Sequence, residues 1–357
     1  MRIAVDTMGA EKGIGIVIKG SLGAIKENPQ IQVSLVGDEK KIKEEIGKLG
    51  LENVPFSIVH ASQIIEMDDS PIASLKSKKN SSISIALDLL KDGGADALVS
   101  AGNTGAVMTL SLLKLGRAKG VKRPCLAAIF PTIDGGRVIL LDVGANIDCK
   151  PYHLFQFAIM GSIYAYKILK KRTPRVGLLN IGTEENKGNK LTLEAFKLLK
   201  HSSLNFVGNI ESRDITSGKV EVVVCDGFIG NVILKFAESF ARATLSVVDI
   251  GAKRTLFGLG RIITRGWRGY LKRNLDYAEY GGVPLLGVNG VCMIAHGASS
   301  SKAIKNAILA SFKFAKAEIN PHIEKALMKS GVVKGEIKRD SDSRNGVLYP
   351  PKSLNQR

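Results

Sequence analysis

Six short loops carry most of the residues whose chemistry could act on an anion, and each follows an apolar run of the chain. They combine glycine with Asp, Asn, Ser or Thr, as in Ser100-Ala-Gly-Asn-Thr-Gly105. Glycine lets backbone N–H groups approach an anion closely, and the start of a helix adds unpaired donors. The loops comprise residues 6–9, 100–105, 142–146, 180–189, 226–231 and 295–298. An ordinary strand-to-helix turn explains any one of them, but their repetition predicts a site for phosphate or a phosphorylated group.

The same loops match none of the common nucleotide or hydrolase signatures. No GxGxxG opens a helix after a strand, and there is no Walker A sequence and no GxSxG nucleophile elbow. Of the five histidines, only His153, four residues after Cys149, has a ligand-like spacing, and such a pair is more often structural. We therefore expect no metal and no cofactor. Two further residues have two possible roles each. His296, which precedes Gly297, and Lys187 could each have a structural role or contact a ligand.

The elements that must position these loops alternate between strand-like apolar runs and helix-like periods. Several runs are apolar on both faces, which indicates buried and largely parallel strands. The alternation predicts a three-layer α/β/α doubly wound sheet with its ligand crevice at the carboxyl ends of the strands. Strands are predicted at residues 3–6, 32–37, 56–61, 97–101, 126–130, 138–143, 176–181, 206–210, 220–225 and 291–296. Helices are predicted at residues 82–91, 104–115, 151–170, 191–200, 231–248 and 300–317.

Size and composition favour a globular enzyme over a disordered or disulfide-stabilised chain. The 357 residues are 45% hydrophobic, and the four cysteines lie far apart without a CxxC pair. We expect residues 1–333 to form a single catalytic α/β domain, with a helical insertion at about 245–277 and a basic mobile tail at 334–357. The N-terminus lacks a signal-peptide pattern and no apolar run suits a spanning helix, which predicts a cytoplasmic location.

The formal net charge of +18 raises the question of a polyanionic partner, such as nucleic acid, anionic lipid or an acidic protein. No nucleic-acid-binding pattern is present, so we expect no nucleic acid. Wound as a helix, residues 254–272 divide into an apolar side and a basic side, which is typical of a membrane-surface helix but also of a core-packed helix or a dimer contact. The predicted membrane-binding residues are Leu256, Leu259, Ile263, Trp267, Arg261, Arg265 and Arg268.

Taken together, these segments resemble the bacterial phosphate acyltransferase family of phospholipid synthesis over most of the chain. The resemblance is carried by the loops above and by stretches such as Asp69-Ser-Pro71, Leu141-Asp-Val-Gly-Ala-Asn-Ile-Asp-Cys-Lys-Pro151 and Lys187-Gly-Asn189. One loop departs from the family, which usually reads Asp-Ala-Met-Gly-Gly-Asp where this chain has Asp6-Thr-Met-Gly-Ala-Glu11. We expect Ala10 to obstruct a backbone conformation that glycine permits, and Glu11 to place its carboxylate one methylene further out.

The resemblance implies an enzyme that makes acyl phosphate from acyl-carrier protein and inorganic phosphate, on a fold like those of isocitrate dehydrogenase and phosphotransacetylase. It also implies a homodimer attached peripherally to an anionic membrane surface, the inner face of the cell membrane. A membrane glycerol-3-phosphate acyltransferase is a further expected partner. The expected phosphate and substrate contacts are Asp6, Gly9, Ser100, Gly102, Asn103, Thr104, Gly105, Asp142, Asn146, Asp226 and Gly227.

Three residues are the expected catalytic groups. Attack of phosphate on a thioester builds an oxyanion beside a dianion, so Lys187 and Asn231 are expected to stabilise that charge. His296 is expected to bind phosphate or to protonate the leaving thiolate. Two alternatives stay open: a phosphotransacetylase-like enzyme that uses acyl coenzyme A, and a basic membrane scaffold that would consume neither donor.

Overall fold

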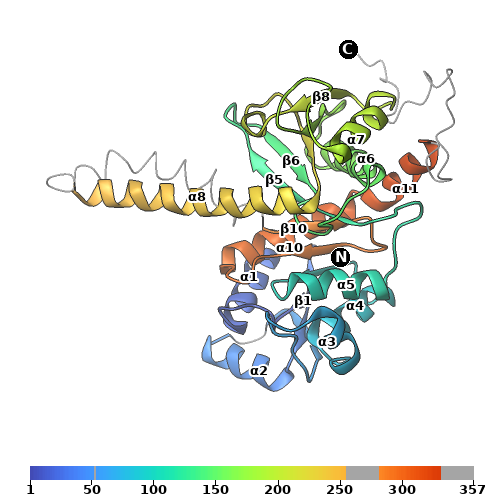
Figure 1. The fold of residues 1–357 in the computed structure, drawn as a ribbon. Helices are drawn as coiled ribbons and strands as arrows, with labels where there is room; N and C mark the ends of the chain where they lie inside the picture. Colours follow the sequence, from blue (N-terminus) through green and yellow to red (C-terminus); the bar gives the residue numbers. More distant parts are fainter. Residues whose placement is uncertain (52–53, 255–280, 331–357) are drawn as a thin grey trace, which may run out of the picture. The chain divides into compact units, whose positions relative to one another are not determined.

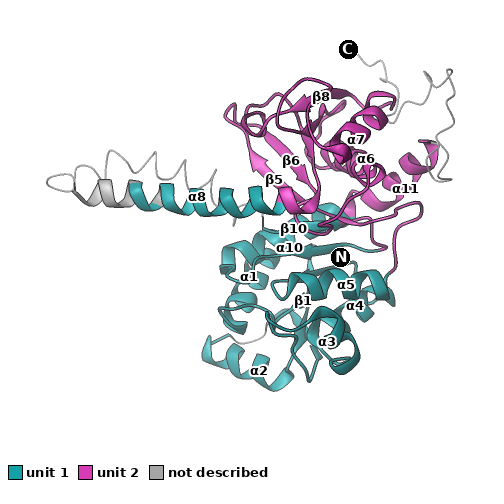
Figure 2. Cartoon of the chain, in the orientation of Figure 1, with its two compact units in different colours: residues 1–115, 231–285, 290–315 teal, residues 116–230, 286–289, 316–357 magenta. Residues whose placement is uncertain are grey.

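The computed structural model describes residues 1–51, 54–254 and 281–330, and the chain divides into two compact units (Figure 2). Unit 1 contains residues 1–115, 231–285 and 290–315, and unit 2 contains residues 116–230, 286–289 and those from 316 onward. The single catalytic domain expected over residues 1–333 stays a prediction. The expected tail at 334–357 and most of the expected insertion lie outside the described residues.

Unit 1 is built on strands in the order β3-β2-β1-β4-β11-β10, of which Figure 1 labels β1 and β10. Neighbouring strands are parallel except for the antiparallel pair β10 and β11. The strands are β1 (Arg2–Asp6), β2 (Gln32–Gly37), β3 (Phe56–His60), β4 (Ala97–Ser100), β10 (Val283–Leu286) and β11 (Cys292–Ile294).

Helices cover both faces of the unit 1 sheet. Ile3 and Val5 of β1 share a buried cluster with Ile18 of α1 and Ile304 of α10. Ala4 points to the opposite face because strand side chains alternate, and α4 packs against β1. The helices are α1 (Ile14–Glu27), α2 (Glu39–Lys48), α3 (Pro71–Ser77), α4 (Ser82–Lys91), α5 (Thr104–Lys114) and α10 (Ser301–Lys316), with α8 (Gly227–Arg254) starting in unit 2.

Unit 2 has its own strands in the order β5-β6-β9-β7-β8, all parallel to their neighbours except β5 and β6. The helix α6, with Pro151 in its first turn, packs on β6 and β9 and contacts α7 and α11. The elements are β5 (Cys125–Pro131), β6 (Arg137–Leu141), α6 (Pro151–Lys167), β7 (Val176–Leu179), α7 (Lys190–Lys200), β8 (Phe206–Ile210), the 3-10 turn η1 (Ser212–Asp214), β9 (Val222–Val224) and α11 (Ile319–Lys329).

These arrangements confirm the predicted doubly wound α/β/α fold. All the predicted strands and helices are present, and the largest shift is in α8, which runs from Gly227 to Arg254. The sequence patterns missed α1, α2, α3, α11 and β10. The pattern missed α1 because this helix contains Gly20, a residue that disfavours helices. A Cβ at this position would lie 2.7 Å from the Cβ of Ile304, so the close packing of α1 on α10 requires glycine here.

Candidate active site

The polar loops of unit 1 lie at a point where the strand order reverses. From β1 the chain moves outward to β2 and β3, and then returns to place β4 on the other side of β1. In open parallel sheets, ligands bind at the carboxyl ends of the strands at such a switch point. Asp6 ends β1 and Ser100 ends β4, so two of the six sequence loops meet there.

Asp6 and Ser100 form the centre of a buried polar network in unit 1. Ser100 Oγ donates to Asp6 Oδ2 at 2.7 Å, and the Gly102 N–H donates to Ser100 Oγ at 3.1 Å. The Met8 N–H donates to the second carboxylate oxygen at 3.0 Å. A Cβ on Gly9 would lie 2.4 Å from Gly102 Cα, so only glycine lets these two loops touch. The network fixes the backbone beside the start of α5.

Both the oxygen and the nitrogen of the Asn103 side-chain amide form hydrogen bonds within the protein. Its Oδ1 accepts from the Ala106 N–H at 3.0 Å and thereby caps α5. Its Nδ2 donates to the backbone carbonyls of Glu66, Met67 and Asp69 at 3.2, 3.0 and 3.1 Å. The side chain therefore ties a second loop to α5 rather than pointing its amide at a ligand. Of the expected phosphate contacts in this loop, the first-turn residues Thr104 and Gly105 stay candidates through their backbone N–H groups.

The loop after β1 accommodates the two residues that depart from the family. Ala10 is buried in the hydrophobic cluster and is not among the residues with positive φ, so the expected obstruction does not arise. The Glu11 N–H donates to the Gly297 carbonyl at 3.1 Å. A Cβ on Gly297 would lie 2.5 Å from the Glu11 carboxylate, so this glycine makes room for the longer side chain. Next to it, His296 Nδ1 accepts from the Ala298 N–H at 3.1 Å, which leaves Nε2 to carry the proton of the neutral ring.

Asp142 is the most heavily bonded carboxylate of unit 2. It is fully buried after β6, and its oxygens accept five N–H groups at 2.7 to 3.3 Å. The donors are the backbone N–H groups of Leu126, Gly144, Ala145 and Asn146 and the side-chain amide of Asn146. Burial raises the pKa of Asp142, while these hydrogen bonds oppose that shift. All five partners are donors, so this cage of five N–H groups suits the ionised carboxylate. Asp142 and Asn146 therefore shape the loop 142–146 from within.

The start of α8 is built against that loop. The Gly227 N–H donates to the Asn146 carbonyl at 2.8 Å, and a Cβ on Gly227 would lie 2.5 Å from the same oxygen. A Cβ on Gly230 would lie 1.8 Å from the Asp142 carbonyl oxygen. Asp226 caps the helix by accepting from the Ile229 N–H at 2.9 Å. Asn231 is the fifth residue of α8 and is exposed.

Lys187 lies in an ordered loop after β7. Asn180 Nδ2 donates to the Lys187 carbonyl at 2.9 Å, and Asn209 Nδ2 donates to the Glu184 carbonyl at 2.8 Å. The Lys187 side chain is exposed, and no described carboxylate forms an ion pair with it. Since β6, β9 and β7 are parallel neighbours, their loops share one edge of the unit 2 sheet. The sequence reasoning missed Asn180 as a positioning residue, although it opens the same loop.

The cysteines near Asp142 are poor nucleophiles. Burial, followed by the Asp142 charge, raises the pKa of Cys149 to about 12. Burial also raises the pKa of Cys225 well above its usual range. A thiol that stays protonated at neutral pH does not attack a thioester readily. Among the described residues, no cluster of three His, Cys, Asp or Glu side chains could hold a metal ion.

The predicted membrane-binding residues Leu256, Leu259, Arg261, Ile263, Arg265, Trp267 and Arg268 lie outside the described residues. The helices that the structure does describe include none long and apolar enough to cross a membrane.

Comparison with known proteins decides the family. A family model described as "Fatty acid synthesis protein" matches residues 1–321. A phosphate acyltransferase of Geotalea daltonii is 45% identical over 331 residues, which cover 92% of this chain and 95% of that protein. The chain belongs to the phosphate acyltransferase family. Another member, from Pelotomaculum thermopropionicum, is 48% identical over 86% of this chain and 90% of its own length. The predicted resemblance is confirmed, and the enzyme is an acyltransferase.

Solved structures show the fold that this family member shares with other enzymes. A phosphotransacetylase from Streptococcus pyogenes superposes with a TM-score of 0.58 at 17% identity, covering 89% of this chain and 94% of that chain. A branched-chain phosphotransacylase from Enterococcus faecalis gives a TM-score of 0.56 at 15% identity, with 88% and 99% covered. The predicted phosphotransacetylase-like architecture is therefore confirmed.

Proposed function

We propose that the enzyme forms acyl phosphate by transferring an acyl group from acyl-carrier protein to inorganic phosphate. The observation that carries the proposal is the near full-length similarity to phosphate acyltransferases, at 45% identity over 331 residues. The carrier protein as donor is what the family resemblance implies, and a formal net charge of +18 suits an acidic protein partner.

The loop geometry supports direct transfer without a covalent enzyme intermediate. Phosphate is itself a nucleophile, and the nearby thiols of Cys149 and Cys225 are held protonated. The enzyme then has to align the reactants and to stabilise the oxyanion that develops on the thioester carbonyl. We assign that stabilisation to Lys187 and Asn231, and phosphate binding to the first turn of α5. We assign His296 either to binding phosphate through its Nε2–H or to passing to the leaving thiolate the proton that the attacking hydrogen phosphate loses. Asp6, Ser100, Asn103, Asp142 and Asn146 position these loops.

Donor choice tests this proposal. The purified enzyme is incubated with inorganic phosphate and either acylated acyl-carrier protein or acyl coenzyme A. The acyl phosphate formed is trapped and quantified. We expect kcat/KM to be about 100-fold higher with the carrier protein, the scale by which remote binding contacts commonly favour one donor. Equal or higher kcat/KM with coenzyme A supports the phosphotransacetylase-like alternative, and no product from either donor supports the scaffold.

We also propose that the acyl phosphate enters phospholipid biosynthesis at the inner face of the cell membrane, where a membrane glycerol-3-phosphate acyltransferase consumes it. The amphipathic pattern of residues 254–272 supports attachment to anionic lipid. Trp267→Asp is expected to weaken binding to anionic vesicles about tenfold or more, because it puts a charge on the apolar side. Vesicle sedimentation checks this, and unchanged binding would contradict membrane attachment through this segment.

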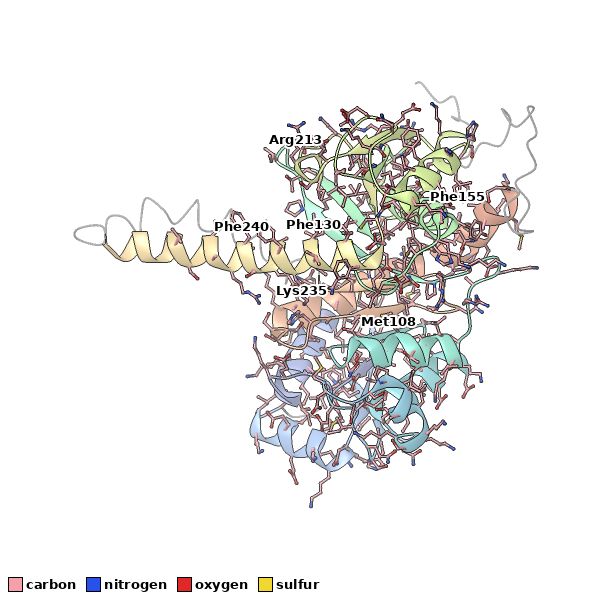
Figure 3. The ribbon with its side chains drawn as sticks, viewed as in Figure 1. Met108, Phe130, Phe155, Arg213, Lys235 and Phe240 are labelled. Carbon is pink, nitrogen blue, oxygen red and sulfur yellow. The ribbon has the colours of Figure 1, made fainter. Side chains whose placement is uncertain are left out.

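A homodimer is proposed on the apolar face of α8 in unit 1. Phe236 and Phe240 are 68% and 61% exposed, and their rings stack at 6.0 Å. Figure 3 labels Phe240 on this helix, and Val232 and Val247 are also exposed along it. Such a stripe is typical of a helix that packs on another molecule. The molecular mass in solution, measured by light scattering, checks it: a monomer at working concentration would contradict the proposal.

A further inference from the structure

A concentrated set of cations in unit 2 is not used by the loops described above. Residues 97–133 contain no Asp or Glu, and they include Arg117, Lys119, Lys122 and Arg123 just before β5. All four side chains are exposed, and none forms an ion pair with a described carboxylate. Unneutralised cations on one short segment form a ready site for an acidic partner.

This segment is held in a fixed shape by α6. Gln156, which is 1% exposed, donates to the Gly120 carbonyl at 2.8 Å and accepts from the Lys122 N–H at 2.8 Å. The Arg117 guanidinium donates to the Lys122 carbonyl at 2.8 Å. Binding to such a segment costs little ordering of the backbone, which favours affinity.

Another cation extends the same charge toward the start of α6. The Lys150 N–H donates to His153 Nδ1 at 3.1 Å. Burial and then the charges of Arg123 and Lys150 lower the pKa of His153, so both cations act on the same imidazole. Asn146 Nδ2 also donates to the Pro124 carbonyl at 2.8 Å, so the loop that leads to Lys150 is tied to the end of residues 117–123.

On its other side the segment is tied to α11. The Lys119 N–H donates to Glu324 Oε1 at 2.9 Å. Glu324 lines a shallow hollow of about 380 Å³ whose other lining residues are Pro321, Lys325, Met328 and Lys329. Met328 is 46% exposed, so the hollow offers an apolar contact flanked by two further lysines.

We propose that residues 117–123, Lys150 and the hollow on α11 form a docking surface for the acidic acyl-carrier protein. This inference rests on the proposed function, because it takes the carrier protein to be the donor. Carboxylates of the partner would pair with the cations of residues 117–123 and Lys150, and an apolar side chain would contact Met328 and Pro321. Exposed charges of this kind mainly set the association rate and its dependence on salt.

The test is a charge reversal of two exposed lysines, Lys119→Glu with Lys122→Glu. The matched control is Arg172→Glu with Lys197→Glu, which makes the same change of net charge at two exposed unit 2 positions that are not part of this surface. Steady-state rates are measured with acyl-carrier protein and with acyl-pantetheine, which carries the same thioester without the protein. For the test variant we expect KM for acyl-carrier protein to rise about tenfold at low salt, kcat to stay within about twofold, and acyl-pantetheine kinetics to be unchanged.

Four other outcomes would contradict the docking surface or the proposed function. A KM that is unchanged, or that rises equally in the control variant, overturns the docking surface. An equal rise with acyl-pantetheine also overturns it, because the lysines then act on the thioester itself. Weaker binding to anionic vesicles with an unchanged KM assigns the surface to the membrane and overturns it as well. If the unmodified enzyme makes no acyl phosphate from the carrier-protein donor, the proposed function fails instead.

Discussion

Replacing Lys187 by alanine is expected to lower kcat about 100-fold or more while the fold is retained. The loop after β7 is ordered by Asn180 and Asn209, and it holds an exposed ammonium group without a described ion-pair partner. A preorganised cation of this kind stabilises charge that develops only in the transition state, and losing one such donor typically costs this much. Asn231→Ala is expected to have an effect of the same size, since this amide is exposed near the start of α8.

The matched control for Lys187 is Lys190→Ala, three residues further along and also exposed. It removes the same charge from the first residue of α7 and is expected to change kcat by less than about twofold, as for a surface lysine without a partner. Trapped acyl phosphate gives the rates, and circular dichroism shows that each variant is folded. Near-normal turnover by folded Lys187→Ala and Asn231→Ala enzymes would refute both assignments.

Asp142→Asn is expected to lower the melting temperature by about 5 °C or more, the largest stability effect that we anticipate for an isosteric change. One oxygen of Asp142 accepts three N–H groups and the other accepts two. The side-chain NH2 group of an asparagine must point toward one of these two sets of N–H groups. At least two buried N–H groups then face another donor and have no acceptor. Each buried group without a partner costs about 1 to 3 kcal/mol.

The control for Asp142 is Asp148→Asn, the same chemical change at an exposed position of the loop that follows. We expect the melting temperature of this variant to stay within about 1 °C of the parent, because surface changes are usually worth less than about 0.5 kcal/mol. Thermal unfolding followed by circular dichroism checks both. Equal melting temperatures for the two variants would show that the cage around Asp142 does not stabilise the fold.

Strand and helix positions were largely predictable because they depend on local patterns. The apolar run at residues 32–37 forms β2, which begins and ends where the sequence predicted, and α4 also has its predicted bounds. The patterns failed where a distant contact sets the residue type. Gly20 suits a helix interior poorly but is required by the close approach of Ile304, and Ala10 fits because the loop avoids positive φ.

The sequence by itself determined that this chain is an α/β protein whose glycine- and asparagine-rich loops follow its strands, and it identified the family that the comparisons confirm. Only the tertiary structure decided what each polar side chain in those loops touches. Asn103 and Asp142 look like ligand contacts along the chain, yet they bond the loop at 66–69 and the backbone of residues 126 and 144–146. The physical reason is that hydrogen-bond partners far apart in sequence are set by strand order and helix packing, which local residue patterns do not encode.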